Sequence, residues 1–268
     1  MDLRSRFKFQ AIPFTREIAV DRLFVLPMYT DAVDALVRAV EQRGSCALLA
    51  PAGSGKTVVG RTVAARLPDA RYRTRYTKMT DLSKRDLCRE IAFAMGVRPA
   101  GSYNFLVRAI QDAALGDTDN DAVRPVLILD DAHELRPDVL GMLRALTNFS
   151  MDSRLVLSLI LIGQPGLGTL LKRPEHEDVA RRLVHYAVLG PLSREETEQY
   201  VAHRCTAAGA VTVPFDRGSL DAIYEVGRGN LRATDVLAAK ALEVADRRDR
   251  DVVDSTCVVE ARKLLWPA

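Results

Sequence analysis

Short apolar runs alternate along the chain with longer segments in which apolar residues recur every three or four positions. Continuous apolar runs are typical of buried strands, and the wider spacing is typical of amphipathic helices. The runs predict strands at Cys46–Ala50, Val126–Leu129 and Leu155–Ile162, and the stretch Arg71–Tyr76 is interpreted as a further strand. The spaced positions predict helices at Lys56–Leu67, Lys84–Met95 and Pro137–Asn148, after a first helix that begins at Thr30 and ends at Gly44. Strands that alternate with helices favour an α/β fold, a parallel sheet with helices on both faces.

The pattern changes after residue 190, where the predicted strands stop. Ser193 and Glu196 have the spacing of a capping box that begins a helix. Further helices are predicted at Glu195–Ala208, Asp216–Val226, Leu231–Arg247 and Ser255–Leu265. We therefore expect an N-terminal segment (residues 1–29), an α/β domain (residues 30–190) and a small all-helical domain (residues 191–268).

Two details concern the start of the chain. Asp31 and Asp34 are expected near the N-terminus of the first helix, where the helix dipole favours carboxylates. Phe14 and Phe24 of the N-terminal segment are expected to pack onto the α/β domain.

Composition excludes several classes of protein. The chain has 268 residues, of which 48% are hydrophobic and 27% charged, an ordinary globular balance. The N-terminus lacks a signal-peptide apolar run, and Leu155–Gly163 is shorter than the roughly 20 residues that span a bilayer. We expect a cytoplasmic protein with no membrane partner. The four cysteines are scattered, which favours free thiols over disulfides or zinc.

A phosphate-binding loop follows the first predicted strand. Its residues are Ala50, Pro51, Ala52, Gly53, Ser54, Gly55, Lys56 and Thr57, with Val58 next in the helix. Small residues let backbone N–H groups surround a phosphate at a helix N-terminus, Lys56 can reach the β- and γ-phosphates, and Thr57 can bind Mg²⁺. Ala50 replaces the first glycine of the motif, which is compatible with a strand-like φ. The sequence predicts binding of ATP and Mg²⁺; the alternative is a glycine-rich turn without a nucleotide.

Two carboxylates, Asp130 and Asp131, end the strand Val126–Leu129. The carboxyl ends of parallel strands form the ligand edge of an open α/β sheet, so both are expected beside the phosphate loop. Asp130 is predicted to hold Mg²⁺ and Asp131 to polarise the attacking water. The alternative is a solvated strand end that caps the next helix.

Five motifs, in this order, resemble those of the AAA+ superfamily of P-loop NTPases. They are the phosphate loop, Asp130-Asp131-Ala132-His133, Leu161-Ile162-Gly163-Gln164-Pro165, Arg181-Arg182-Leu183 and Gly227-Arg228-Gly229-Asn230-Leu231-Arg232. Together with Pro13-Phe14-Thr15-Arg16-Glu17-Ile18, they are similar to the ExeA-like branch, which includes ATPase helpers of DNA transposition (the TniB, TnsC, IstB and Mu B type). The resemblance covers nearly the whole chain and implies that the C-terminal helices form a lid.

The resemblance also implies roles for four further residues. Gln164 matches the sensor that orients the attacking water, Arg182 or its neighbour Arg181 matches the arginine finger that reaches into the next subunit's ATP, and Arg232 matches the second sensor. If the family resemblance is set aside, Gln164 can equally be interpreted as a turn residue before Pro165, and the arginines as surface residues. Asp131 stands where relatives usually carry Glu, so we expect slow hydrolysis, and Leu231 stands in place of their Pro.

Basic residues gather between residues 71 and 89, although the formal net charge of +3 implies nucleic acid only weakly. Arg71, Arg73 and Arg75 alternate, which predicts one basic face on a strand followed by a turn at residues 77–80. Loops in this region line the channel of ring-forming relatives. We predict that Lys78, Arg73, Arg75, Thr80 and Lys84 contact the backbone of duplex DNA; the alternative is a solvated edge strand.

Taken with these features, the resemblance implies an ATP-dependent regulator of DNA transposition that assembles as a ring or helical filament on duplex DNA. Its expected partners are a transposase and a target-selection protein. The alternatives are a secretion-associated ATPase of the ExeA type, and a signalling or loader ATPase that does not bind DNA. Among the histidines, His133 is expected to make a polar contact near the site, and His176, His185 and His203 to lie at a surface or interface.

Overall fold

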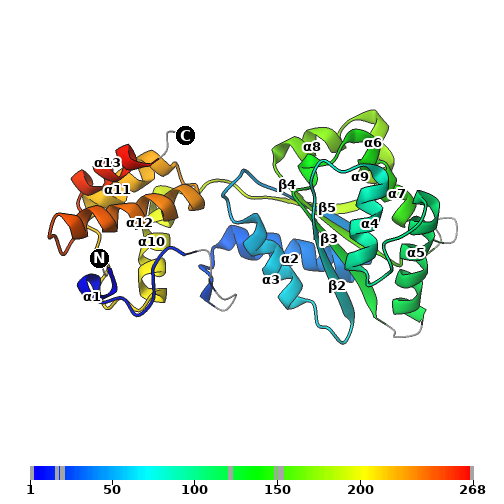
Figure 1. Ribbon diagram of the computed structural model, residues 1–268, viewed down its shortest axis with the longest axis horizontal. Helices are drawn as coiled ribbons and strands as arrows, with labels where there is room; N and C mark the ends of the chain where they lie inside the picture. The colour runs from blue at the N-terminus through cyan, green and yellow to red at the C-terminus, as the bar shows by residue number, and fades with distance from the viewer. Residues whose placement is uncertain are drawn as a thin grey trace. The chain divides into compact units, whose positions relative to one another are not determined.

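The computed structural model describes residues 3–15, 18, 22–119, 123–147, 149 and 154–265. Contacts divide the chain into two units (Figure 1). The α/β unit comprises residues 26–52 and 56–189, and the helical unit comprises residues 1–25, 53–55 and 190–268.

The α/β unit is built on a five-stranded sheet in the order β2-β3-β4-β1-β5, in which every neighbouring pair is parallel. The strands are β1 (Ser45–Leu49), β2 (Tyr72–Lys78), β3 (Arg124–Asp130), β4 (Ser158–Gly163) and β5 (Leu183–Val188). The three central strands are almost wholly buried, because helices cover both of their faces. The predicted parallel α/β sheet is confirmed.

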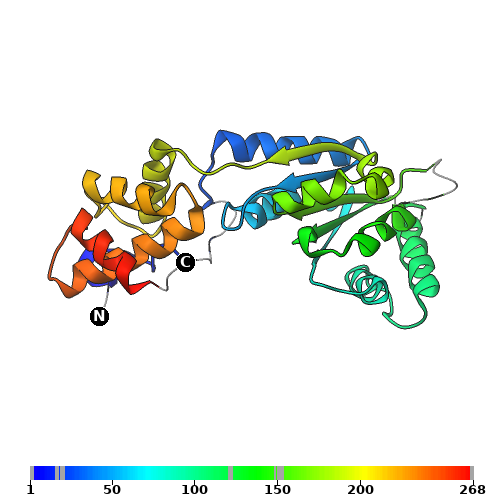
Figure 2. The same cartoon turned by 90° about the horizontal axis from the view of Figure 1, so that it is seen from above.

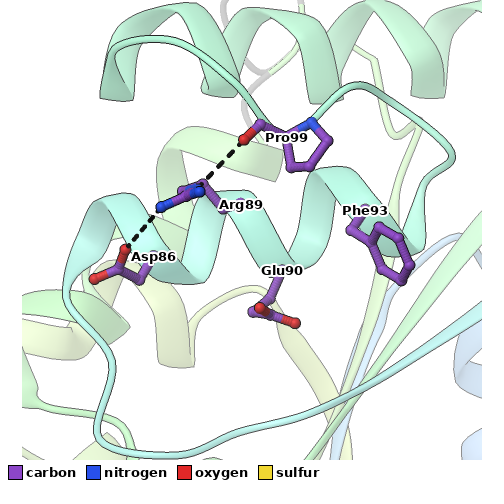
Figure 3. A pocket seen from close by; sticks show the side chains of 5 residues that line it. All are labelled: Asp86, Arg89, Glu90, Phe93 and Pro99. Carbon is purple, nitrogen blue, oxygen red and sulfur yellow. Dashed lines mark hydrogen bonds and ion pairs between the residues drawn. The ribbon is translucent and has the colours of Figure 1, made fainter.

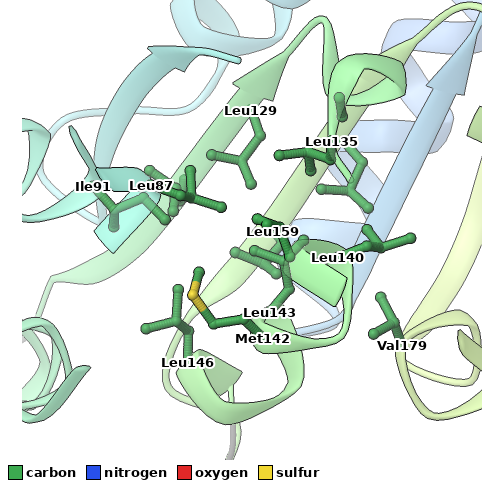
Figure 4. Close-up of a cluster of buried hydrophobic side chains, with 14 of the residues drawn as sticks. Leu87, Ile91, Leu129, Leu135, Leu140, Met142, Leu143, Leu146, Leu159 and Val179 are labelled. Atoms are coloured by element: carbon green, nitrogen blue, oxygen red, sulfur yellow. The ribbon is translucent and has the colours of Figure 1, made fainter. Parts of the chain in front are cut away.

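Helices lie on both faces of this sheet (Figures 1 and 2). One face carries α2 (Pro27–Glu41) and α3 (Lys56–Arg66). The other carries α4 (Lys84–Ala94), α5 (Tyr103–Asp119), η2 (Ala132–Glu134), α6 (Pro137–Leu140), α7 (Met142–Thr147), α8 (Pro165–Leu171), η3 (Pro174–His176) and α9 (Glu177–Ala180). On that second face Leu129 and Leu159 pack with Leu87, Leu143 and other apolar side chains in one buried cluster (Figure 4).

Several predicted boundaries were wrong. Strand β2 runs to Lys78 rather than Tyr76, because it stays paired with β3 as far as Asp130. The last central strand begins at Ser158 rather than Leu155. The helix predicted at Pro137–Asn148 is interrupted at Gly141, and Asn148 lies outside the described residues.

Helix α2 begins at Pro27, three residues before the predicted start. Proline suits the first helical turn, where its missing N–H has no partner to lose. The first turn therefore holds no acidic residue, and Asp31 and Asp34 lie beyond the reach of the helix dipole that was expected to favour them.

The helical unit contains α1 (Leu3–Phe7), α10 (Arg194–Ala207), α11 (Arg217–Gly227), α12 (Leu231–Arg247) and α13 (Ser255–Leu264). The predicted capping box is present: Ser193 Oγ accepts the Glu196 N–H, and the Glu196 carboxylate accepts the Ser193 N–H. Side chains of Asp216, Asn230 and Asp254 cap the other three long helices in the same position.

Phe14 and Phe24 of the N-terminal segment pack within the helical unit, whereas they were expected to pack onto the α/β domain. Phe14 meets Phe215 edge-on, with ring centroids 6.0 Å apart. Phe24 contacts Tyr200 in the same manner at 5.7 Å. The Arg204 guanidinium donates to the Thr15 carbonyl at 2.5 Å. Aromatic contacts and a buried cation therefore hold this segment to the helices.

Within the described ranges, no helix combines the length and the apolar character required to cross a bilayer.

Candidate nucleotide site

The predicted phosphate loop joins β1 to α3. Ala50 continues the strand, since its N–H donates to the Gly163 carbonyl at 3.0 Å. Gly53 and Gly55 have φ of +78° and +87°, a region that residues with a Cβ rarely adopt. The buried Lys56 ammonium donates to the Ala50 and Pro51 carbonyls, at 3.0 and 2.8 Å. The loop is thus a curved backbone with a cation folded against it and a helix N-terminus behind it.

Asp130 is the buried last residue of β3, and three donors hold its carboxylate. Thr57 Oγ1 lies 3.4 Å from Oδ2, the Tyr76 hydroxyl donates to the same oxygen at 3.1 Å, and the Asp131 N–H donates to Oδ1 at 2.8 Å. Thr57 and Asp130 are therefore brought together as predicted. A hydroxyl and a carboxylate are hard oxygen ligands, so this pair fits Mg²⁺, which keeps its remaining positions for water and phosphate oxygens.

Tyr76 was not predicted as a site residue. Desolvation, reinforced by the Asp130 carboxylate, raises the pKa of Tyr76 to about 12, so the phenol stays protonated and donates at neutral pH. Its place follows from the strand order, since β2 lies directly beside β3. A prediction that placed β2 beside β3 would have identified Tyr76 as a neighbour of Asp130.

Asp131 follows β3 in the left-handed conformation, with φ +55° and ψ +32°. Its Oδ2 lies 3.2 Å from the ammonium of Lys78, the last residue of β2. Both side chains are partly exposed, at 30% for Asp131 and 64% for Lys78, so solvent screens the pair. A residue predicted to contact DNA thus touches the carboxylate predicted to polarise water.

Gln164 directly follows β4 and is the N-cap residue of α8. Its terminal amide lies 2.5 Å from Nε2 of His133, which η2 carries. The polar contact expected of His133 is therefore with the predicted sensor itself.

The predicted arginines lie in two places. Arg181 ends α9 with an exposed side chain that pairs with Glu177 at 2.7 Å. Arg182 is half-buried, and its carbonyl accepts the Ser45 N–H at 3.3 Å. Arg232 is the second residue of α12, and its N–H donates at 3.2 Å to the carbonyl of Gly53, a loop residue that groups with the helical unit.

The residues predicted to contact DNA lie on both faces of β2 and beyond its end. Successive side chains of β2 point to opposite faces, so Lys78 lies on the face opposite to Arg73 and Arg75, and Arg71 precedes the strand. Arg73 pairs with Asp117 at 2.5 Å, and Lys84 lies 3.9 Å from Asp138. Thr80 is exposed beyond the strand end. Residues 77 and 78 belong to the strand, so the turn predicted at residues 77–80 was wrong.

Two other features lie apart from these residues. His176, expected at a surface or interface, is buried within the chain at 3% exposure. A pocket of about 410 Å³ lies along α4, lined by Asp86, Arg89, Glu90, Phe93 and Pro99 (Figure 3). None of its lining residues belongs to the candidate nucleotide site.

A parallel sheet with a phosphate loop after β1 and a carboxylate pair after β3 defines the α/β P-loop NTPases. This chain belongs to the AAA domain family, whose model matches residues 38–171, half of the chain.

One curated protein and several solved structures are similar to this chain. The chain is 29% identical over 239 residues to "General secretion pathway protein A" of Aeromonas hydrophila, which covers 88% of this chain and 43% of that protein. The chain therefore spans less than half the length of this curated relative. Similar solved structures include Cdc6p of Pyrobaculum aerophilum (TM-score 0.74, 17% identity, 100% of this chain and 72% of that one). The ORC1 protein of Aeropyrum pernix in complex with DNA is also similar (TM-score 0.68, 18% identity, 91% and 66%). At these identities the structures show a shared fold alone.

Proposed function

We propose that this chain is an ATPase that hydrolyses Mg²⁺-bound ATP. The observation that carries the proposal is the contact of Thr57 with the Asp130 carboxylate beside the Lys56 loop. In the proposal Lys56 exchanges its two loop carbonyls for β- and γ-phosphate oxygens, and Thr57 and Asp130 hold Mg²⁺, which neutralises charge on the phosphates. Asp131 polarises the attacking water.

Replacement of the loop lysine tests this proposal. Lys56→Ala is expected to lower ATP affinity roughly 100-fold, since it removes the cation that pairs with the phosphates. Lys172→Ala, which removes an exposed lysine, is the matched control and should bind as wild type. Affinity is measured by calorimetry with Mg²⁺, and hydrolysis by phosphate release. Wild-type protein that binds no adenine nucleotide would overturn the proposal.

Assembly completes the site in this proposal. Arg182 or Arg181 of a second copy spreads positive charge over the transferred phosphoryl group, and Arg232 of the helical unit responds to the terminal phosphate. When each copy contributes an arginine to the nucleotide site of its neighbour, the copies assemble into a ring or a helical filament. This assembly forms with ATP and loosens after hydrolysis.

The finer proposal is that the assembly binds duplex DNA without sequence preference and regulates transposition together with a transposase. Its support is the motif resemblance and the Lys78–Asp131 contact at 3.2 Å. A DNA phosphate that attracts Lys78 would release Asp131 toward water, which would couple DNA binding to hydrolysis. Arg73, Arg75, Thr80 and Lys84 would add backbone contacts that weaken steeply with salt.

This proposal predicts that some variants change DNA binding alone and that another changes both DNA binding and ATPase activity. Arg75→Ala and Lys84→Ala are expected to weaken binding to random duplex DNA and leave ATPase activity without DNA unchanged. Lys78→Ala is expected to change both, because it removes a DNA contact and the partner of Asp131. ATP-dependent binding is measured by fluorescence anisotropy across a salt series, where each lost phosphate contact lowers the salt slope by about one.

A second candidate is a secretion-associated ATPase, which the similarity to "General secretion pathway protein A" favours. In that role the helical unit would engage a protein partner, and the basic residues of β2 would serve solubility. Absence of DNA binding at low salt with ATP present would favour this candidate over the transposition proposal.

A further inference from the structure

We propose that His133 is a positioning residue for ATP hydrolysis, which acts by fixing the orientation of the Gln164 carboxamide. The proposal rests on the ATPase function proposed above and deepens it.

Backbone geometry brings the two residues together. The left-handed Asp131 follows β3 and turns the chain directly into η2, which carries His133. This turn lies against the end of β4, where a Cβ on Gly163 would come within 3.1 Å of the His133 N–H nitrogen. A side chain at this position would crowd the close approach, which glycine therefore favours, and the next residue, Gln164, reaches the imidazole.

The contacts of the imidazole decide its tautomer. Nε2 lies 2.5 Å from the Gln164 side-chain atom placed as the amide nitrogen and 3.2 Å from Oε1 of Glu134. Nδ1 is buried and has no hydrogen-bond partner among the described residues. A buried N–H without an acceptor is costlier than a bare nitrogen lone pair, so the proton belongs on Nε2. That N–H faces the Glu134 carboxylate and the Gln164 amide.

The tautomer of His133 then determines the orientation of the Gln164 side-chain amide. A nitrogen that donates requires an acceptor, so we assign oxygen, in place of the nitrogen, to the Gln164 amide atom that faces His133. The oxygen and nitrogen of an amide are distinguished by such networks and not by shape. Its NH₂ group therefore points away from His133. Without His133 as a partner, the terminal torsion of a glutamine side chain has two broad minima, so either the amide oxygen or the NH₂ group could face the reacting phosphate. In this way His133 orients the Gln164 amide so that the two N–H donors of its NH₂ group face a phosphoryl oxygen or the attacking water.

Two polar substitutions separate this role from a merely structural one. Glutamine carries its amide about as far from the backbone as Nε2 of histidine, whereas asparagine reaches only the position of Nδ1. We expect His133→Ala and His133→Asn to lower kcat roughly 10- to 100-fold, with the KM for ATP changed less than about twofold. His133→Gln is expected to restore most of the activity. Equal losses in the Gln and Asn variants, or a raised KM with unchanged kcat, would overturn the proposal.

A double variant tests whether His133 acts through Gln164. Gln164→Ala removes the amide, so His133→Ala should cause no further loss of kcat in that background. Losses that multiply would overturn the proposal, since His133 would then act elsewhere. Thermal melting of each variant checks folding, and the Gln and Asn comparison decides the matter if the Ala variant is unfolded. Wild-type protein without ATPase activity would overturn the proposed function instead.

Discussion

At the scale of single residues, the conformation of Asp131 is as informative as its charge. A left-handed backbone costs roughly 1–2 kcal/mol for a residue with a Cβ, although Asp and Asn tolerate it best. Here it carries the chain away from the sheet edge and leaves the carboxylate beside Lys78. The strain and the ion pair both occur at the residue proposed to polarise water, which is typical of a functional site.

Asp131→Asn is therefore expected to abolish hydrolysis without harming the fold. Asparagine suits the left-handed conformation, but its amide polarises water poorly, so kcat should fall roughly 100-fold or more while ATP affinity stays near wild type. Phosphate release and nucleotide binding are measured together. Asp81→Asn, at an exposed aspartate, is the control and should change neither. Retained turnover in Asp131→Asn would show that another group activates the water.

At the scale of elements, burial explains what the sequence pattern could predict. Strands β1, β3 and β4 are buried on both faces, so each is a continuous apolar run. Edge strand β5 was missed because most of its side chains are exposed and leave no such run. Helix α5 was missed because its buried stripe is thin and the exposed Phe105 blurs it.

The candidate site divides in a similar way. The phosphate loop and the Asp130–Asp131 pair are contiguous in sequence, so their chemistry is legible without a structure. The partnerships of Tyr76, Lys78 and His133 join segments that only the strand order brings together. A single sequence contains no signal for that order beyond the resemblance to a family.

The loop between α11 and α12 depends on Gly229, whose φ is +72°. A Cβ there would lie 2.1 Å from the Leu192 carbonyl oxygen, a backbone atom. Gly229→Ala should therefore destabilise the helical unit by roughly 1–2 kcal/mol for the backbone conformation and a further 1–3 kcal/mol for the overlap.

Gly96 is the matched control for this prediction. Its φ is +75°, and a Cβ there meets nothing within 4 Å. Gly96→Ala should cost only about 1–2 kcal/mol, in the unfolding transition of the α/β unit. Urea unfolding monitored by circular dichroism gives both values, and equal costs would contradict the overlap at Gly229.

A buried carboxylate makes the helical unit sensitive to pH. Desolvation raises the pKa of Asp235 from 3.8 to about 6, although Arg204 and the Tyr200 hydroxyl oppose the shift. The folded state then binds this proton more tightly than the unfolded state. Its contribution to stability is complete below about pH 4 and is lost as the pH rises through about 6.

Asp235→Asn should remove this dependence. Asn keeps an acceptor for the Tyr200 hydroxyl, which donates to Asp235 at 2.9 Å. Between about pH 4 and pH 7, wild type should lose up to roughly 3 kcal/mol of unfolding free energy relative to the variant. Urea titrations at several pH values measure the difference, and a difference that stays constant with pH would contradict the shift.

At the scale of the whole molecule, the α/β unit supplies the phosphate-loop residues outside 53–55, the proposed Mg²⁺ ligands and the carboxylate proposed to polarise water. In the proposal, the arginine fingers Arg181 and Arg182 act at the nucleotide site of a second copy of the chain. Arg181 is the more exposed of the two, and the backbone carbonyl of Arg182 accepts the Ser45 N–H of β1. Substitution of both side chains therefore leaves the backbone contact to Ser45 intact, so a double variant can test the finger without dismantling the sheet edge.

Mixing two inactive variants tests whether the fingers act between copies. Arg181→Ala/Arg182→Ala keeps a complete site without fingers, and Asp131→Asn keeps its fingers beside an inactive site. Each alone should show little hydrolysis. In an equal mixture, about a quarter of head-to-tail interfaces pair an intact site with an intact finger, so a comparable fraction of wild-type activity should return with ATP. Single arginine variants mixed in the same way identify the finger. Activity that never exceeds the sum of the two variants, although both bind ATP, would mean that each copy hydrolyses ATP with its own residues alone.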